Sequence, residues 1–281
     1  MRNHGRVQGG ADLGAQDHLC WIAEHDDDWL PAAREFLAEG RALGQRLVYV
    51  GPQPVAELAQ RLAPIGDVDA LLEQGALVLF TLEQLYDLDA ALDPEQQLAM
   101  YSAVGDQAVV DGYVGLRVVA DVTRLVADPG RRAEHARWEL LADCYMAEHL
   151  FAAMCVYDRR VVGDECAGDL ACVHALARAP EEVAPFSLFG NGCELALYGD
   201  VDLFSAPALA RALARAPQRE GDVVIDLAPA GYLDHHALAA FVDRSIALRD
   251  RDRRLVLRNP SRGVRKMYAT LGFDTRNMQL A

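Results

Sequence analysis

The sequence lacks any apolar run near the roughly 20 residues that a membrane-spanning helix requires. Its first residues, MRNHGRVQGGADLGAQ, also lack the apolar stretch of a signal peptide. We therefore expect a cytoplasmic protein that does not insert into membranes. We also predict that residues 1–16 form a disordered segment.

Basic residues are fewer than acidic ones: 27 Lys and Arg stand against 42 Asp and Glu, which gives a formal net charge of −15. The arginines are scattered among acids and form no basic stripe. Because such a charge repels phosphate backbones, direct binding of nucleic acid is not expected.

No C-x-x-C pair occurs in the sequence. Most of the six cysteines lie inside apolar segments, which favours buried, reduced thiols; they are Cys20, Cys144, Cys155, Cys166, Cys172 and Cys193. A metal or redox site built from Cys166, Cys172 and His174 is the alternative, with little support from the spacing. We predict neither a metal nor a cofactor.

What the sequence does contain is an alternation typical of α/β proteins. Its length and its 52% hydrophobic residues suggest about two domains. Between residues 18 and 178, short apolar runs alternate with amphipathic stretches, which predicts a parallel sheet covered by helices. The predicted strands are HLCWIA (18–23), RLVYVG (46–51), ALVLFT (76–81), LRVVAD (116–121) and FAAMCVYD (151–158). The longer predicted helices lie at 26–44, 94–112 and 131–150.

The pattern restarts after a stretch punctuated by Pro180, Pro185, Gly190 and Gly192. We therefore predict a first domain over 17–178, a linker over 179–190 and a small α/β domain over 191–281. In the second domain the predicted strands are 193–199, 222–228 and 254–260, and the predicted helices are 203–216, 234–252 and 261–272.

Three stretches of the second domain resemble a STAS domain, the fold of sulfate-transporter tails and of bacterial anti-sigma factor antagonists. They are LYGDVDLFSAPALARAL, VVIDLAPAGYLDHHALAAF and RLVLRNPSRGVRKMYATLGFDT. In the antagonists a helix begins with Asp-Ser, and a partner kinase phosphorylates the serine. Here Asp234 matches the aspartate and His235 stands in place of the serine. The resemblance implies that His235 is a vacated phosphoacceptor position.

The same resemblance implies a protein partner, either an anti-sigma factor or a histidine-kinase-like ATPase. We expect it to bind through Asp234, His235, His236 and Asp243.

Other interpretations of the two histidines stay open. Adjacent side chains point about 100° apart on a helix, which disfavours a shared metal ion. No G-x-S-x-G motif supports a catalytic His-Asp pair. Both histidines could simply be solvated residues of the helix start.

The first domain resembles the MEDS domain, the methanogen/methylotroph sensory domain thought to descend from RecA-like ATPases. The matching stretches are DHLCWIAEHDDDWLPAAREFLAEGRALGQRLVYV, GYVGLRVVADV, RWELLADCYMAEHLFAAMCVYDRR and CVHALA. The resemblance implies a degenerate RecA-like sheet. It also implies a set of ligand-sensing residues: His18, Arg117, Glu139, Cys155, Tyr157, Asp158 and His174. For each of them, a hydrogen-bonded structural role is the alternative.

Nucleotide hydrolysis is not expected. A RecA-like ATPase has a Gly-rich loop with Lys after its first strand, to hold the phosphates. Here that turn reads AEHDDDW (23–29), without glycine or lysine. Its four acids would repel a triphosphate.

Taken together, these features favour a non-enzymatic regulator of transcription in which the first domain senses and the STAS domain binds the partner. We expect a small apolar ligand in a pocket at the carboxyl ends of the strands, where Arg117, Tyr157 and Asp158 could converge. One alternative is a small-molecule-modifying enzyme that uses His18, Cys155 and Asp158. Another is a scaffold in a stress-signalling complex. Formation of a homo-oligomer stays open.

Overall fold

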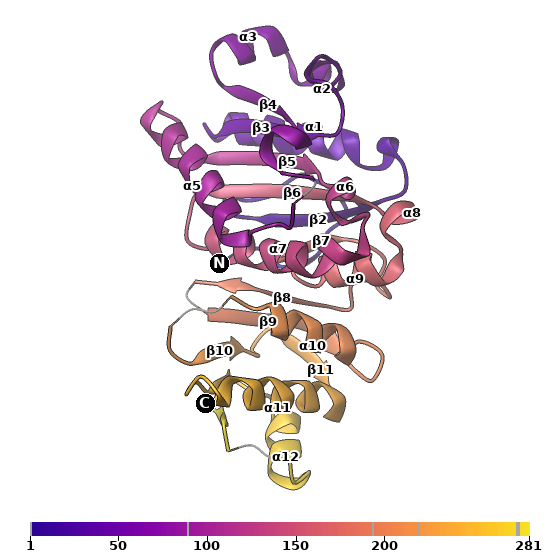
Figure 1. Cartoon of the computed structure of the whole chain (residues 1–281), viewed down its shortest axis with the longest axis vertical. Coiled ribbons are helices and arrows are strands. Elements are labelled where there is room, and N and C mark those ends of the chain that lie inside the picture. Colours follow the sequence, from indigo (N-terminus) through magenta and orange to yellow (C-terminus); the bar gives the residue numbers. More distant parts are fainter. Residues whose placement is uncertain (1, 89, 193, 218–219, 274–275) are drawn as a thin grey trace.

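The computed structural model of the chain describes residues 2–88, 90–192, 194–217, 220–273 and 276–281. Cys193, one of the cysteines expected to be a buried thiol, lies outside the described residues. Two α/β domains are stacked along the long axis of the molecule (Figure 1). No helix in the described ranges is both long and apolar enough to cross a bilayer.

The first domain contains a seven-stranded sheet of order β1-β7-β2-β6-β5-β3-β4, and all its paired strands are parallel. Its strands are β1 (Gly5–Arg6), β2 (His18–Ala23), β3 (Arg46–Gly51), β4 (Leu77–Thr81), β5 (Leu116–Asp121), β6 (Phe151–Asp158) and β7 (Leu176–Arg178). Its longer helices are α1 (Asp26–Ala42), α2 (Val55–Leu62), α3 (Val68–Glu73), α5 (Pro94–Val110), α7 (Arg132–Met146) and α9 (Asp164–Ala171). Short helical turns complete it: η1 (Ala63–Ile65), α4 (Leu82–Leu85), α6 (Thr123–Val126), η2 (Pro129–Arg131) and α8 (Arg159–Val162). The predicted parallel sheet is confirmed.

Helices cover both faces of this sheet because successive side chains of a strand point to opposite faces. In β2, Cys20 and Ile22 pack in the core with α5, α7 and α9. Leu19 and Trp21 pack in the other core, with α1, α2 and α3. Both faces of every central strand are therefore buried, as the continuous apolar runs predicted.

The start of the chain differs from the expected disordered segment. Gly5 and Arg6 form β1 and pair with β7, and the Arg2 guanidinium reaches the buried carboxylate of Asp143. Further along the segment, the backbone carbonyl oxygens of Leu13 and Gly14 accept hydrogen bonds from Arg117. In the structure these parts of the segment are thus bound to the first domain. Polar contacts hold this segment, and a search for apolar runs does not detect them.

The second domain has a sheet of order β11-β9-β10-β12-β13, with β8 antiparallel on β9 and all other pairs parallel. Its strands are β8 (Phe186–Asn191), β9 (Glu194–Val201), β10 (Val223–Asp226), β11 (Ala230–Leu233), β12 (Leu255–Arg258) and β13 (Met278–Leu280). Its helices are α10 (Ala206–Arg215), α11 (His235–Arg249) and α12 (Arg262–Thr270). Residues 186–190, predicted as linker, thus belong to the sheet of this domain.

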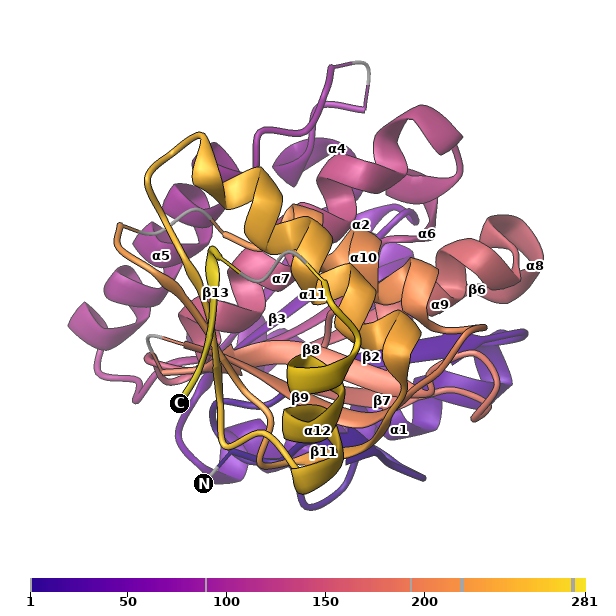
Figure 2. The same cartoon turned by 90° about the horizontal axis from the view of Figure 1, so that it is seen from below.

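The two domains share one hydrophobic core. β8 and α10 pack against α7, and α10 also contacts α9. Figure 2 shows α10 and α11 side by side, with α7 behind them. Arg211 and Arg215 of α10 both pair with the Asp169 carboxylate of α9, at 2.7 and 2.8 Å. One cluster of buried residues extends from Cys20 in β2 to Met278 in β13. Helix α7 is therefore buried between the first sheet and the second domain.

Candidate functional site

The candidate site lies beneath α7, on the face of the helix that meets the first sheet. His135, Glu139 and Asp143 are spaced four residues apart, so they share one face of the helix. All three are buried. Charged groups so deep in a core require partners, and these partners come from β2, β6 and the turn before β7.

Four residues bring their polar atoms together there, and we call them the tetrad: His18, Glu139, Cys155 and His174. One ligand-type atom of each lies within 4.8 Å of the others. Glu139 Oε2 is 3.3 Å from His18 Nε2, 3.5 Å from Cys155 Sγ and 3.4 Å from His174 Nε2. Cys155 Sγ is 3.5 Å from His18 Nε2.

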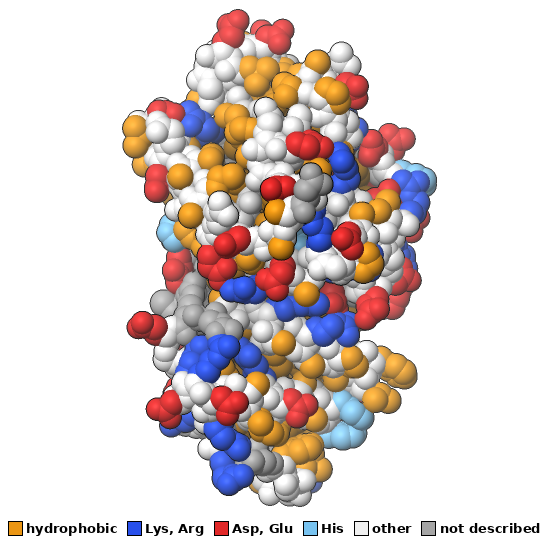
Figure 3. Space-filling view, viewed as in Figure 1, with side chains coloured by type: hydrophobic (Ala, Val, Ile, Leu, Met, Phe, Trp, Pro, Cys, Tyr) orange, Lys and Arg blue, Asp and Glu red, His pale blue; other side chains and the backbone are white. Residues whose placement is uncertain are grey.

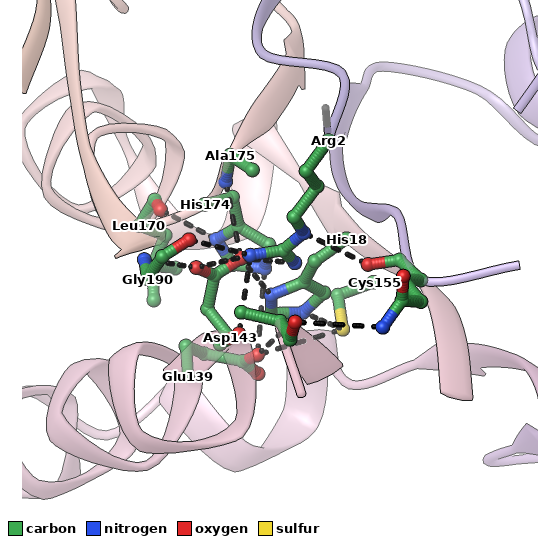
Figure 4. A network of polar contacts seen from close by, with 11 residues as sticks. Arg2, His18, Glu139, Asp143, Cys155, Leu170, His174, Ala175 and Gly190 are labelled. Carbon is green, nitrogen blue, oxygen red and sulfur yellow. Dashed lines mark hydrogen bonds and ion pairs between the residues drawn. The ribbon is translucent and has the colours of Figure 1, made fainter. Parts of the chain in front are cut away.

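Every tetrad side chain except Cys155 also has a polar partner outside the tetrad, as Figure 4 shows for the two histidines. His18 Nδ1 contacts Asp143 Oδ1 at 3.2 Å. His174 Nδ1 donates to the backbone oxygen of Leu170 at 2.8 Å. The other oxygen of Glu139, Oε1, accepts the Tyr157 hydroxyl at 2.7 Å. His135 Nε2 lies 2.9 Å from that same oxygen. The tetrad atoms thus face one another in fixed orientations.

Burial and proximity shift the pKa values of these groups. Burial alone would raise the pKa of Glu139, but His135 and the two other imidazoles beside it hold that pKa well below its ordinary value. Burial, followed by the negative charge of Glu139, raises the pKa of the Cys155 thiol well above 9.0. Burial, followed by the charge of His18, lowers the pKa of His174. Glu139 is therefore charged at neutral pH, whereas Cys155 is a thiol.

Asp143 connects the tetrad to the second domain. Its Oδ1 contacts His18 Nδ1 and accepts the Ala175 amide, while its Oδ2 accepts the Gly190 amide of β8 at 2.6 Å. Arg2 forms a fork on the same carboxylate at 2.8 and 2.9 Å. Burial would raise the pKa of Asp143, but the positive charge of Arg2 and the hydrogen bond to His18 lower it. One carboxylate thus joins the tetrad, the start of the chain and β8.

Two of the seven predicted sensing residues lie elsewhere. Arg117 is fully buried on the opposite face of the sheet, where its guanidinium stacks on Phe36 with 3.8 Å between its Cζ and the ring centroid. Gly40 leaves room for it, because a Cβ there would stand 2.5 Å from the Arg117 Cγ. Asp158 ends β6 and binds Arg160 in the next turn. The structure therefore does not assemble His18, Cys155 and Asp158 into one site.

A cavity of about 200 Å³ does lie at the carboxyl ends of the strands. Asp121 and Asp158 line it, together with Trp29 of α1, but Arg117 and Tyr157 do not. The expected convergence of Arg117, Tyr157 and Asp158 in a pocket is therefore wrong.

The acidic turn after β2 is folded onto its own backbone. The Asp28 carboxylate accepts the amides of Glu24 and His25 at 3.2 and 2.9 Å. Asp26 pairs with Arg61 at 2.8 Å. A carboxylate of the chain thus takes hydrogen bonds at the place where a RecA-like loop would offer its amides to phosphate.

The second candidate site is the start of α11. Asp234 caps the helix and accepts the amides of His236 and Ala237 at 2.7 and 3.1 Å. His236 Nδ1 contacts the same carboxylate at 3.1 Å. The rings of His235 and His236 lie with centroids 3.9 Å apart, closer than their helical angle predicted, because Asp234 draws the His236 ring back over the helix start.

Exposed apolar side chains surround this helix start. Asp234 follows Leu233 of β11, which pairs with Val201 at the end of β9. Leu203 and Phe204, just beyond Val201, are 53% and 88% exposed, and Tyr232 is 64% exposed. Figure 3 shows the histidines of this domain beside hydrophobic side chains on the surface. Asp243 is exposed further along α11, whereas Ser245 is fully buried.

Sequence reasoning missed three residues of the first site. The spacing of His135, Glu139 and Asp143 along one predicted helix was a usable signal for two of them. No sequence signal points to Arg2, because its partner lies 141 positions away.

Two family models match the chain. Residues 17–175 match MEDS, the "MEthanogen/methylotroph, DcmR Sensory domain", and residues 186–280 match the "Mlab, STAS domain". The first match covers more than half of the sequence. No curated protein matches the chain at a significant level.

Proposed function

The chain belongs to the MEDS family and carries a STAS domain behind its sensory domain, and from this premise we propose that it controls an anti-sigma factor or a histidine-kinase-like ATPase. The two domains support a signalling regulator. We propose that the state of the sensory domain sets how the STAS domain binds its partner, and that transcription is the output.

The observation that carries this proposal is the position of Asp143. Its carboxylate contacts His18 of the tetrad and accepts the Gly190 amide of β8, 3.2 and 2.6 Å away. A change of charge or geometry at the tetrad therefore acts on the strand that begins the STAS sheet. Because the interface is packed and shares a core, such a change is transmitted as a shift of packed elements.

The proposed partner surface is the start of α11 with the exposed side chains around it. Asp234, His235 and His236 begin the helix, and Phe204 and Tyr232 add apolar area. Asp243 lies seven residues after His236, about two helical turns, and so on the same stripe. Exposed aromatic side chains beside charged ones are typical of interaction surfaces.

We further propose that the protein is not an enzyme. The Cys155 thiol has a raised pKa and is 7% exposed, which makes it a poor nucleophile. Asp158 of the alternative enzyme site pairs with Arg160. These observations support a sensory role for the tetrad over a catalytic one.

The test is direct binding. Isothermal titration of the full chain against purified anti-sigma factors and histidine-kinase-like ATPases of the same organism should give one binding partner. Asp243→Arg should weaken that binding by about tenfold or more, a loss of about 1.4 kcal/mol, because it reverses a charge on the proposed surface.

The matched control is Asp106→Arg, which reverses an exposed acid on α5 of the sensory domain. It should bind like the wild type. Equal effects of the two variants, or a mapped interface confined to the β13 edge of the sheet, would contradict the proposed surface. Absence of binding by every protein of both classes would contradict the proposed function.

A further inference from the structure

We propose that the tetrad is a four-coordinate site for one divalent transition-metal ion of the zinc class. Neither the proposed partner nor the proposed output is needed for this inference. It rests on the distances, the hydrogen bonds behind each ligand and the chemistry of the donors.

The distances match those of a tetrahedral site. With metal bonds of about 2.0–2.2 Å to nitrogen or oxygen and about 2.3 Å to sulfur, a tetrahedron places two N or O ligands about 3.4 Å apart. Sulfur then lies about 3.6 Å from each of them. Glu139 Oε2 is 3.3 and 3.4 Å from the two imidazole nitrogens. Cys155 Sγ is 3.5 Å from His18 Nε2 and 3.5 Å from Glu139 Oε2.

The hydrogen bonds behind the tetrad are those of metal ligands. A metal-binding histidine usually donates its second ring N–H to a carboxylate or a backbone carbonyl. His18 Nδ1 contacts the Asp143 carboxylate, and His174 Nδ1 donates to the Leu170 carbonyl. Glu139 uses Oε1 for Tyr157 and keeps Oε2 for the tetrad. Each of these partners fixes a ligand atom toward the common centre.

Without an ion, one buried acceptor of the tetrad, His174 Nε2, has no hydrogen-bond donor among the described residues. Because His174 donates through Nδ1, its neutral ring presents a lone pair at Nε2. That atom is fully buried and has no hydrogen-bond partner among the described residues. His18 lies between two carboxylates, with Nδ1 3.2 Å from Asp143 Oδ1 and Nε2 3.3 Å from Glu139 Oε2. Protonating both rings would place two cations in a core with ring centroids 4.0 Å apart. A metal cation at the centre would bind the His174 lone pair and the Glu139 carboxylate at once, without a second protonated ring.

The donor set also indicates the class of ion. Two imidazoles, a thiolate and a carboxylate suit zinc and its first-row neighbours, whereas calcium and magnesium require mostly oxygen ligands. On binding, Cys155 loses its thiol proton to solvent, and the charges of thiolate and Glu139 balance the divalent ion. Because all four positions are filled by protein and buried, the site is of the closed, non-catalytic kind.

The experiment uses the full chain after chelator treatment. A His235→Ala, His236→Ala background removes the surface group at the start of α11, whose atoms also lie within 4.8 Å of one another. Native mass spectrometry after incubation with Zn²⁺ should show one bound ion per chain. Titration with Co²⁺ should give the intense visible bands of a tetrahedral site and a thiolate-to-cobalt charge-transfer band.

Cys155→Ala should abolish the charge-transfer band and weaken Zn²⁺ binding more than about tenfold. Loss of a residue that only hydrogen-bonds a metal ligand already weakens metal binding about tenfold, and Cys155 is itself a ligand in this proposal. Cys166→Ala, which removes another buried thiol on α9, should leave both unchanged. Circular dichroism of the metal-free variants checks that they are folded.

If Cys155→Ala does not fold, the mass spectra and cobalt spectra of the His235→Ala, His236→Ala variant test the proposal by themselves. No bound zinc, or cobalt bound without a thiolate band, would overturn the proposal. So would a folded Cys155→Ala that keeps the wild-type spectrum. None of these measurements involves a protein partner, so failure here leaves the test of Asp243 unaffected, and the reverse also holds.

Discussion

The backbone amide of Gly190 donates a hydrogen bond to the carboxylate of Asp143 at 2.6 Å. Gly190 belongs to the STAS sheet and Asp143 to the sensory domain, and Asp143 is fully buried. A buried carboxylate keeps its charge only while its donors stay in place. The two domains are therefore held together by a contact that neither can lose without leaving this charge short of a partner.

Gly190→Ala should loosen this contact. A Cβ at position 190 would stand 2.6 Å from the Cα of Cys144, a backbone atom that cannot move aside. We expect a loss of about 1–3 kcal/mol in the free energy of unfolding, as for other overpacked sites. Urea denaturation measures it. Gly9→Ala, where no atom lies within 4 Å of the added Cβ, is the control and should unfold like the wild type. Equal urea midpoints of unfolding for the two variants would contradict the close packing of Gly190 in β8 against Cys144 in α7.

Arg2→Ala should destabilise the protein by about 3 kcal/mol, because it removes one partner of a buried ion pair. The Arg2 and Asp143 side chains are 8% and 0% exposed, so water cannot replace the guanidinium easily. Thermal and chemical denaturation give the loss. The control is Arg6→Ala, whose pair with Glu181 is 42% and 76% exposed and should contribute at most about 1 kcal/mol. A smaller effect at Arg2 than at Arg6 would contradict the arrangement around Asp143.

Asp234 should make the STAS domain sensitive to acid. Burial would raise the pKa of Asp234, but hydrogen bonds from the His236 side chain and from two backbone amides lower it. A carboxyl group with a lowered folded-state pKa stabilises the fold above its unfolded pKa of about 3.9, and this contribution is lost as the pH falls further. Asp234→Ala should lower the free energy of unfolding by about 1 kcal/mol at pH 5.5, and by less at pH 3.

Asp234→Asn is the control for this prediction, because asparagine caps helices about as well but does not titrate. At pH 5.5 the Asp234→Asn variant should be about as stable as the wild type. Between pH 5.5 and pH 3, its free energy of unfolding should fall by less than that of the wild type. Urea denaturation at the two pH values provides the comparison. A wild type and an Asp234→Asn variant with the same pH dependence would sink this assignment.

His235→Ser should create a substrate for anti-sigma kinases, if the STAS domain docks as we propose. His235 is exposed at the first position of α11, where a phosphate would be favoured by the helix N-terminus. The wild type should take up no phosphate on this helix, since Ser245 is fully buried and donates to the Val242 carbonyl. Incubation with labelled ATP and mapping of the label provide the test.

Ala239→Ser is the control, because it adds a hydroxyl one turn further along the same helix. It should remain unlabelled. Label on any residue between Gly231 and Ser245 of the wild type would contradict the view that His235 replaces the phosphoacceptor.

Strands buried on both faces could be predicted from the sequence, and shorter elements could not. β2, β3, β5 and β6 follow their apolar runs to the residue, because a central parallel strand is apolar on both faces. β8 was missed because Pro185 and the glycines around it are typical of loops. In the structure Gly190 serves close packing against α7, a contact between segments 46 residues apart that local patterns do not encode.

The candidate site was predicted in part, for a similar reason. His18, Glu139, Cys155, Tyr157 and His174 lie together, as the family resemblance implied. Ala120 pairs with Cys155 in the sheet, so Arg117, three residues before Ala120, points to the opposite face. Asp158 is likewise three residues beyond Cys155. Alternation along β6 alone places Asp158 on the face opposite Cys155, so the sequence could have excluded it. The placement of Arg117 depends on the register between β5 and β6, which one sequence does not specify.

β8 belongs to the STAS sheet by its hydrogen bonds and to the sensory domain by its packing on α7. If this sensory domain were fused to another kind of output domain, that domain would need a strand that packs on α7 and donates to Asp143 as β8 does. Otherwise the carboxylate of Asp143 and the apolar side of α7 would be left open to water. A recombination point before β8 therefore cuts through a shared core, and it also removes α10, which packs on α7 and α9.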